Sequence, residues 1–491
     1  MDTNFVVGAC LLLPVLGAFL VLILGSRPNV REAATLLTGG LTFWHVWGLL
    51  HHVREGARPR LELLEIVPGV QLAFEVEPLG LLFALVASFL WIVTTLYAIG
   101  YMRGHHEENQ TRFFFFFAIA IAGALGVAFS ANLFTLFAFY EVLTLCTFPL
   151  VTHHQTDEAR KAGRVYLGIL LTTSVAFQLL AIIWTWQLAD TVDFTDGGIL
   201  AGTASNGVLS VILVLFVFGV GKAAVMPFHR WLPAAMVAPT PVSALLHAVA
   251  VVKAGVFTVL KVAVYVFGID LLGTLAATTW LAWVAAATII LGSLVAFQKD
   301  NLKARLAYST ISQLSYIVLG ALLANEWGVI GGGMHIAMHA FGKITLFFAA
   351  GAVLVAAHEK DISRMHGLGR TMPITFGAFF VGSLSIIGLP PAGGSWSKWF
   401  LGMGTLEAGQ VGLLAVLMLS SLLSLYYLLE VPVKAFFFRP PDDAQRGKGI
   451  KEAPLPSLIA IGITASATVG FFFWPDLWHE LMSMVVSGVA Q

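Results

Sequence analysis

Apolar stretches about 20 residues long recur from one end of this chain to the other, and this is the length that crosses a bilayer as an α-helix. Hydrophobic residues make up 58% of the 491 residues and charged residues only 11%. No polar stretch is long enough to bury a core of its own. The sequence therefore predicts an all-α polytopic membrane protein without a soluble domain.

The apolar stretches divide into about fourteen predicted spans. The first span lacks the basic region and cleavage site of a signal peptide, so we expect it to be a retained helix. We place the spans at roughly 5–24, 33–52, 78–100, 113–130, 132–151, 164–187, 207–227, 241–266, 274–297, 306–324, 328–357, 373–405, 410–436 and 456–475. Only about 16 residues follow the last of them.

The positions of lysine and arginine predict the orientation, because cytoplasmic loops are enriched in both residues. Most of the 27 basic residues fall in loops that follow odd-numbered spans. The last such loop holds Arg439, Arg446, Lys448 and Lys451. The opposite loops hold only Arg54, Arg58 and Arg60. We therefore expect both termini to face outside, as an even number of spans requires.

Charged residues inside the spans indicate an ion path. The lysines placed there are Lys222, Lys253, Lys261, Lys343 and Lys398, and the acids are Glu141 and Glu430. Each charge near the bilayer centre costs roughly 2.5–3.5 kcal/mol on insertion scales, so several such charges require a shielded and hydrated interior. Lys261 and Glu430 lie near span ends, where their side chains can reach the interface. Glu141, Lys222, Lys253 and Lys398 lie deeper, and the alternative for them is an ion pair that only fixes helix packing.

Two spans are interrupted by proline and glycine. Proline removes a backbone donor and frees carbonyl groups, which then need other partners. One interruption follows Lys222, and it contains Pro227, Pro233, Pro239 and Pro241. The other is the segment 388–394, just before Lys398. Two interrupted spans, each with a lysine, indicate a mid-membrane site in a transporter built from repeats.

The interrupted spans are the fourth of two predicted five-helix units, spans 4–8 and spans 9–13. An odd number of helices in each unit requires the two units to have inverted topology. We expect helices 1–3 in residues 1–112, the two units in 113–267 and 272–437, and a cytoplasmic loop with the last helix in 438–491.

Histidines accompany the lysines. His335, His339 and Lys343 are spaced i, i+4 and i+8, so they share one face of a helix, and His247 precedes Lys253 by six residues. Imidazole titrates near neutral pH, which favours a proton relay. The alternative is histidines that are merely packed. A zinc site is not expected, because Ile336 follows His335 where a zinc protease needs glutamate.

Five motifs resemble the antiporter-like subunits shared by Mrp-type multisubunit cation/proton antiporters and respiratory complex I. They occur in order, from span 5 to span 12, as FAFYEVLTLCTFPLV (137–151), GKAAVMPFHRWLPAAMVAPTPVSALLHAVAVVKAG (221–255), DNLKARLAYSTISQLSY (300–316), HIAMHAFGKITLFFAAG (335–351) and GLPPAGGSWSKW (388–399). The resemblance implies a proton-translocating subunit with fourteen helices, of which helices 7 and 12 are broken.

The resemblance also assigns roles to residues of this chain. It implies that Glu141 on helix 5 pairs with Lys222 on helix 7. It implies that Lys253 on helix 8 is followed by the helix 11 relay of His335, His339 and Lys343, and that Lys398 on helix 12 lies at the outlet. The proton-transfer set expected from sequence is Glu141, Lys222, His247, Lys253, His335, His339, Lys343 and Lys398.

Within this family the chain looks most like the D-type subunits of Mrp antiporters. The M-type subunits of complex I carry glutamate where Lys398 stands, and the L-type subunits continue into a long lateral helix after their last span. Cys146 and Phe148 replace residues that are more often polar or tyrosine.

The implied function is proton translocation within a monovalent cation/proton antiporter complex, with sodium as the expected cation. The implied partners are the bilayer and other membrane subunits. Three alternatives stay open: a redox-driven subunit of a complex I-like or hydrogenase complex, an energising subunit of a bicarbonate-uptake complex, and a structural membrane anchor. No nucleotide, haem or iron–sulfur motif is present, so we expect neither a cofactor nor nucleic acid.

Overall fold

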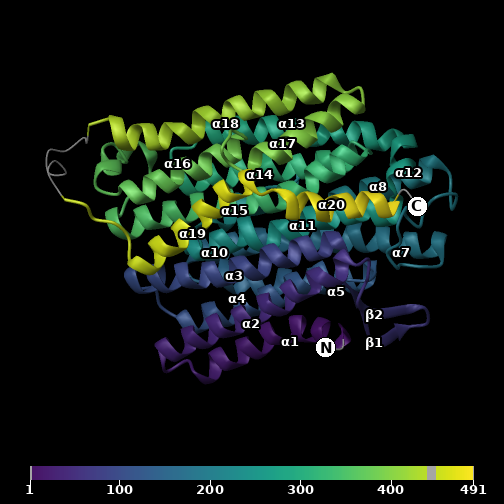
Figure 1. Cartoon of the computed structure of the whole chain (residues 1–491), viewed down its shortest axis with the longest axis horizontal. Helices are drawn as coiled ribbons and strands as arrows, with labels where there is room; N and C mark the ends of the chain where they lie inside the picture. The colour runs from purple at the N-terminus through teal and green to yellow at the C-terminus, as the bar shows by residue number, and fades with distance from the viewer. Residues whose placement is uncertain (1–2, 440–448, 490–491) are drawn as a thin grey trace.

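The computed structural model describes residues 3–439 and 449–489 as a bundle of long helices (Figure 1). Ten helical stretches in these residues are long and apolar enough to cross a membrane. Two shorter apolar helices are the first halves of the broken spans, and two further long helices, α2 and α14, complete the fourteen predicted spans. Arg446 and Lys448 of the predicted cytoplasmic loop lie outside the described residues.

The uninterrupted spans are α1 (Thr3–Ile23), α2 (Pro28–Arg54), α3 (Pro78–Gly104), α4 (Gln110–Ala128), α5 (Leu133–Val151), α13 (Ala276–Gln298), α14 (Leu302–Leu322), α15 (Glu326–Ala357), α18 (Val411–Phe437) and α19 (Leu455–Phe473). Two spans contain π turns: α6 (Asp157–Thr173) continues through η1 (Ser174–Gln178) into α7 (Leu179–Ala189), and α10 (Thr240–Ala244) continues through η4 (Leu245–Val249) into α11 (Val251–Val262) and η5 (Ala263–Phe267). A short helix, α12 (Ile269–Thr274), precedes α13.

The two predicted interruptions are present. α8 (Asn206–Gly219) gives way to a short turn, η2 (Gly221–Ala223), and the chain becomes helical again at α9 (Trp231–Ala234) and η3 (Ala235–Val237). α16 (Pro373–Ile387) follows the turns η6 (Ile362–Arg364) and η7 (Leu368–Arg370), and it is separated from α17 (Gly394–Glu407) by residues 388–393. The boundaries of the two five-helix units stay a prediction.

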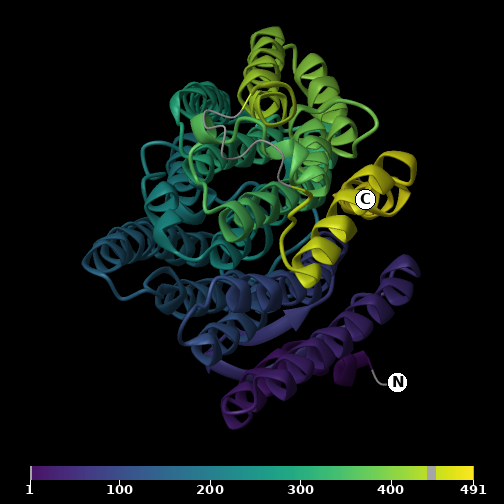
Figure 2. The ribbon, with the colours of Figure 1, turned by 90° about the vertical axis from the view of Figure 1, so that its left-hand side faces the viewer.

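A β-hairpin was missed by the sequence analysis. Strands β1 (Arg60–Val67) and β2 (Val70–Glu75) pair antiparallel, with Val67 opposite Val70 around the Pro68–Gly69 turn. The signal was a Pro-Gly pair between two apolar segments. Both termini lie toward this end of the bundle, which we call the hairpin end (Figure 1). We call the opposite end, which contains loops 105–109 and 152–156, the basic end; Figure 2 looks onto it.

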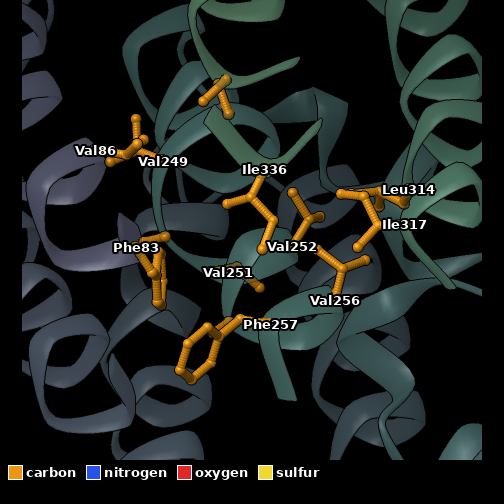
Figure 3. Packing of buried hydrophobic residues seen from close by; sticks show 14 of the residues in the cluster. Phe83, Val86, Val249, Val251, Val252, Val256, Phe257, Leu314, Ile317 and Ile336 are labelled. Carbon is orange, nitrogen blue, oxygen red and sulfur yellow. The ribbon is translucent and has the colours of Figure 1, made fainter. Parts of the chain in front are cut away.

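The centre of the bundle is formed by α11 and α15. In the span Thr240–Phe267 the most apolar window is completely buried inside the protein. Figure 3 shows Val252 and Val256 of α11 facing Leu314 and Ile317 of α14, with Ile336 of α15 beside them. The α1–α2 pair lies at one edge of the bundle (Figure 2). Residues 251–262 of α11 and residues 328–353 of α15 are therefore all buried.

Lys261 does not reach the interface as expected from its position. It is fully buried on α11, where its Nζ lies 3.1 Å from Glu77 Oε1 and donates to the Ser130 carbonyl at 2.8 Å. Glu77 also accepts the Tyr265 hydroxyl at 2.8 Å and caps the start of α3. Sequence analysis overlooked Glu77 because it precedes its span by one residue. The pair is a closed, satisfied ion pair near the hairpin end.

Glu430 is likewise paired and only partly exposed. Its carboxylate lies 2.5 Å from Arg305 Nη1 and 2.6 Å from Lys434 Nζ. The side chain therefore links α14 to α18 near the basic end.

The chain after the last predicted span forms another helix, α20 (Asp476–Val489), beyond Pro475. It packs on α15, where a Cβ added at Gly333 would lie 2.2 Å from Met482 Sδ. Glu480 accepts a bidentate hydrogen bond from Arg54 at 2.7 and 3.0 Å, at the end of α2. A separate helix thus follows the last span, α19, after a break at Pro475.

Candidate proton path

Glu141 and Lys222 do not form the ion pair that the resemblance implies. Lys222 Nζ donates to the Tyr140 carbonyl at 2.7 Å and to Thr144 Oγ1 at 2.5 Å, and it lies 3.1 Å from the centre of the Tyr140 ring. Both carboxylate oxygens of Glu141, the next residue of α5, are buried without a hydrogen-bond partner among the described residues. The structure thus leaves an ammonium group and a carboxylate near each other and unpaired.

The broken helix holds Lys222 through its freed backbone groups. The backbone N–H of Lys222 donates to the Tyr140 hydroxyl at 3.0 Å, and the Trp231 indole donates to the Gly221 carbonyl at 2.9 Å. A Cβ at Gly255 of α11 would lie 2.8 Å from Lys222 Cβ and 2.4 Å from the next backbone nitrogen. Glycine at 255 therefore allows the unwound segment to press against α11.

Lys253 is connected directly to the histidines of α15. Its Nζ lies 2.6 Å from His339 Nδ1, and all three side chains, Lys253, His339 and His335, are buried. The rings of His339 and His335 are stacked 5.7 Å apart, as their spacing on one helix face predicts. An imidazole nitrogen can accept from an ammonium group or donate to a neutral amine, so this contact fits both protonation states of the lysine.

His335 continues this series of contacts toward α17. We call the side chains of Glu141, Lys222, Lys253, His339, His335 and Lys398 the row. Its Nδ1 lies 2.8 Å from Ser397 Oγ, and its Nε2 lies 3.2 Å from Gln313 Oε1. Its ring is also stacked on Tyr316 of α14, with ring centres 5.7 Å apart. Ser397 precedes Lys398, so the histidine contacts lead to the second broken helix.

Lys398 occupies the break between α16 and α17. Its Nζ donates to the Ile387 carbonyl at 3.1 Å and to Ser421 Oγ at 3.0 Å, and it lies 4.7 Å from the centre of the Tyr316 ring. A cation is favoured there because Ile387 is the last residue of α16. Gly388 has φ +91°, and a Cβ there would lie 2.6 Å from Lys398 Cδ. A cavity of about 510 Å³ adjoins the lysine.

Lys343 forms a branch of the row. Its buried Nζ donates to Ser309 Oγ at 2.7 Å. The Tyr427 hydroxyl donates to the same serine at 3.0 Å and lies 3.0 Å from Ser424 Oγ. The hydroxyl groups extend the row from α15 through α14 to α18.

His247 stands in the π turn η4, between α10 and α11. It is fully buried beside Phe347, with ring centres 4.9 Å apart, and neither ring nitrogen has a hydrogen-bond partner among the described residues. π turns inside α-helices are frequent at functional sites. The structure thus places His247 on the helix that carries Lys253.

The row carries more positive than negative charge. Lys222, Lys253, Lys343 and Lys398 contact hydroxyls, carbonyls or an imidazole, and Glu141 is the single acid beside them in the described part of the chain. Charged groups inside a membrane protein are costly, so side chains of this kind are candidates for an ion path. No three His, Cys, Asp or Glu side chains of residues 3–439 and 449–489 are close enough to hold a metal ion.

Sequence reasoning missed the neutral groups that hold the lysines: Tyr140, Thr144, Ser309, Gln313, Tyr316, Ser397 and Ser421. The sequence pattern indicates these residues only weakly, because Ser and Thr are common in membrane helices and their hydroxyl groups often bond to the backbone of their own helix. The spacing Tyr140 to Thr144, one helical turn beside Glu141, was the clearest clue.

Comparison with known proteins places this geometry in a family. A family model described as NADH:quinone oxidoreductase/Mrp antiporter, TM, matches residues 130–424. A second, described as NADH-ubiquinone oxidoreductase (complex I), chain 5 N-terminus, matches residues 68–114. The two matches together cover both broken helices and every residue of the predicted proton-transfer set.

NADH-quinone oxidoreductase subunit N of Desulforudis audaxviator is 35% identical over 392 residues, which cover 79% of this chain and 76% of that protein. A probable K(+)/H(+) antiporter protein of Rhizobium meliloti, the A/B component of its complex, is 31% identical over 471 residues, which cover 92% of this chain but 45% of that protein. The chain also spans about half the length of other curated relatives, 50% and 54% of two of them.

A chain in the structure of the Mrp complex from Dietzia sp. DQ12-45-1b has the same fold. The TM-score is 0.87 at 22% identity, and the match covers 100% of this chain and 98% of the other.

The two fully buried lysines of α11 should respond in opposite ways to replacement by methionine. Lys261→Met leaves the Glu77 carboxylate buried without its counter-ion, so we expect a loss of about 3–5 kcal/mol in unfolding free energy. Lys253→Met removes a buried charge that has no acidic partner, so we expect an equal or higher melting midpoint. Thermal unfolding at one fixed scan rate measures both. A drop for Lys253→Met as large as that for Lys261→Met would contradict the assignment.

Proposed function

The chain belongs to the NADH:quinone oxidoreductase/Mrp antiporter transmembrane family, and on this premise we propose that it translocates protons within a multisubunit monovalent cation/proton antiporter. The protons pass along the row from Glu141 through Lys222, Lys253, His339 and His335 to Lys398. Lys343 and His247 exchange protons with the row from α15 and η4. The chain contributes this path and no redox or hydrolytic chemistry of its own.

The contact series from Lys253 to Lys398 carries the proposal. Lys253 contacts His339, His339 stacks on His335, and His335 contacts both Ser397 and Tyr316 beside Lys398. Each of these groups can donate or accept a proton. The stacks of His339 on His335 and of His335 on Tyr316 are ring contacts, whereas the contacts to Lys253 and Ser397 are hydrogen bonds. A structural anchor has no need for unpaired ammonium groups, because removing them favours folding.

Movement of Glu141 would switch Lys222. An opposite charge within about 4–6 Å favours the ammonium form of a lysine, and burial favours the neutral amine. Each tenfold change in the ratio of the ammonium form to the neutral amine corresponds to about 1.4 kcal/mol. With Glu141 turned away, Lys222 rests on neutral oxygens of Tyr140 and Thr144 and can release its proton toward Lys253.

The exchanged cation that we propose is sodium, in a complex where this chain takes the place of the D-type Mrp component. The K(+)/H(+) antiporter relative, which aligns with 92% of this chain, supports cation exchange. The second candidate is a proton-pumping subunit of a complex I-like oxidoreductase, and the relative named NADH-quinone oxidoreductase subunit N supports it. We place the complex in a bacterial cell membrane, with both termini outside.

Identification of the partner subunits separates the two candidates. The native complex, purified through a tag on this chain and analysed by mass spectrometry, should contain several small membrane subunits and should exchange sodium for protons in liposomes. Co-purification of subunits that bind quinone and iron–sulfur clusters would instead establish the redox-driven complex.

Replacement of Lys398 tests whether this lysine carries a proton. Lys398→Ala removes the group and should abolish proton-coupled exchange. Lys398→Arg keeps the charge, and the adjoining cavity of about 510 Å³ can receive the larger group, but guanidinium does not release its proton. We therefore expect both variants to be inactive in the assembled complex. Normal exchange by the arginine variant would reduce Lys398 to a packing charge.

A further inference from the structure

A second cluster of titratable side chains lies outside the mid-membrane row, at the basic end. Glu107 follows α3, and its carboxylate lies 3.1 Å from His105 Nδ1 and 3.1 Å from His154 Nε2. The Glu107 side chain is 6% exposed, whereas those of His105 and His154 are 35% and 39% exposed. We call these three residues the Glu107 cluster. It presents two accessible imidazoles above one buried carboxylate.

Other charged groups surround this carboxylate. Burial acts to raise the pKa of Glu107, but the hydrogen bond and positive charge of His154 outweigh it and hold that pKa below its ordinary value. The same hydrogen bond raises the pKa of His154. The titratable or charged side chains that face the cluster from neighbouring elements are Tyr101 on α3, Arg112 on α4, His153 after α5 and Lys303 on α14. The cluster therefore keeps a proton on His154 to higher pH than a free imidazole does.

A strip of buried polar groups leads inward from the cluster. The ring of His105 is stacked on Tyr101, with centres 5.6 Å apart, and the Tyr101 hydroxyl accepts from Thr240 Oγ1 at 3.4 Å. Thr240 begins α10, and Ser243 and His247 follow at positions i+3 and i+7 on the same helix face. The strip thus connects the surface cluster to a member of the proton-transfer set.

The wall opposite this strip is α15. Lys343, Phe347 and Gly351 are spaced i, i+4 and i+8 on one face of that helix. A Cβ at Gly351 would lie 2.8 Å from Thr240 Cγ2, and the ring of Phe347 lies beside His247. The strip therefore lies between α10 and α15, which are neighbours in the bundle (Figure 1), and the spacing along α15 places Lys343 two turns further inward than Gly351.

Two residues of this strip carry buried polar atoms without a hydrogen-bond partner among the described residues. Ser243 Oγ and both ring nitrogens of His247 are buried without a hydrogen-bond partner in the part of the chain that the structure describes. Each buried polar group left without a partner costs about 1–3 kcal/mol. Native proteins satisfy such groups with internal water molecules that bridge them. Ser243 and His247 are one helical turn apart, so water that bridges them would form part of a hydrated path.

We propose that the Glu107 cluster collects protons at the basic end and passes them along Tyr101, Thr240, Ser243 and His247 to Lys343. This inference rests on the proposed function, because it supplies the row with protons. His105 or His154 takes a proton from solvent, and each hydroxyl then accepts one proton as it donates another, so only the imidazoles and Lys343 change charge. The orientation expected from the basic residues makes this the cytoplasmic inlet.

Two substitutions with matched controls test the proposal in the assembled complex. Glu107→Gln removes the carboxylate, and Glu158→Gln changes an exposed glutamate near the same end of the bundle. Ser243→Ala removes a hydroxyl from the strip, and Ser383→Ala removes a buried hydroxyl on α16 that bonds to its own helix. We expect several-fold slower proton-coupled exchange for the first member of each pair and wild-type rates for the controls.

The pH dependence distinguishes collection of protons from a structural role. With membrane vesicles that expose the basic end to the assay buffer, the loss for Glu107→Gln should be large at alkaline pH and should shrink as the buffer is acidified. A rate equal to wild type at every pH would overturn the proposal. Lys398→Ala serves as the reference variant. If Lys398→Ala is inactive while Glu107→Gln exchanges protons normally, the proposed inlet is wrong and the row stands. If Lys398→Ala is fully active, the proposed function itself fails.

Thiol labelling tests hydration of the strip without relying on activity. In a background with Cys10→Ala and Cys146→Ala, we expect Ser243→Cys to react with a membrane-impermeant thiosulfonate added at the basic end and not at the hairpin end. Ser383→Cys should stay unlabelled from both sides. An unlabelled Ser243→Cys in an assembled and active complex would show the strip to be dry and would reject the path.

Discussion

The five lysines inside the bundle differ in the groups that hold their ammonium nitrogen, and the proposed function depends on this difference. Lys261 lies on a carboxylate, which stabilises only its charged form. Lys253 lies on an imidazole, and Lys222, Lys343 and Lys398 lie on hydroxyl or carbonyl oxygens. Hydroxyl and imidazole partners can turn to accept from an ammonium group or donate to a neutral amine. Four lysines therefore have partners without a negative charge, and the fifth, Lys261, is paired with an acid.

The two broken helices hold their lysines in the same manner. Lys222 lies over the ring of Tyr140 on α5, and Lys398 lies over the ring of Tyr316 on α14, the second helix of each predicted unit. Each lysine also donates to a backbone carbonyl and to a hydroxyl group. This likeness supports the division into two related units, which residue-by-residue comparison of the halves does not reveal. Glu141 has no acidic counterpart in α14, where Ile317 follows Tyr316.

The spans, both interruptions and the spacing of His335, His339 and Lys343 could be predicted, because hydropathy and helix periodicity are local properties. The pairing of Lys261 with Glu77 could not, because it joins residues far apart in sequence. The unpaired state of Glu141 depends on how α5 packs against the unwound turn, and an implied partner does not reveal that. The hairpin was overlooked because attention to long apolar stretches hides short strands.

The central claim is that protons move through the lysines of the row, and Lys253 offers the most direct test because its contact with His339 joins α11 to α15 in the proposed path. The assembled complex would be reconstituted in liposomes containing a pH-sensitive dye, and a cation gradient would be imposed. We expect Lys253→Met to abolish the internal pH change with normal assembly, whereas Lys360→Met, at an exposed lysine, should have no effect. An internal pH change of wild-type size with Lys253→Met would contradict the central claim.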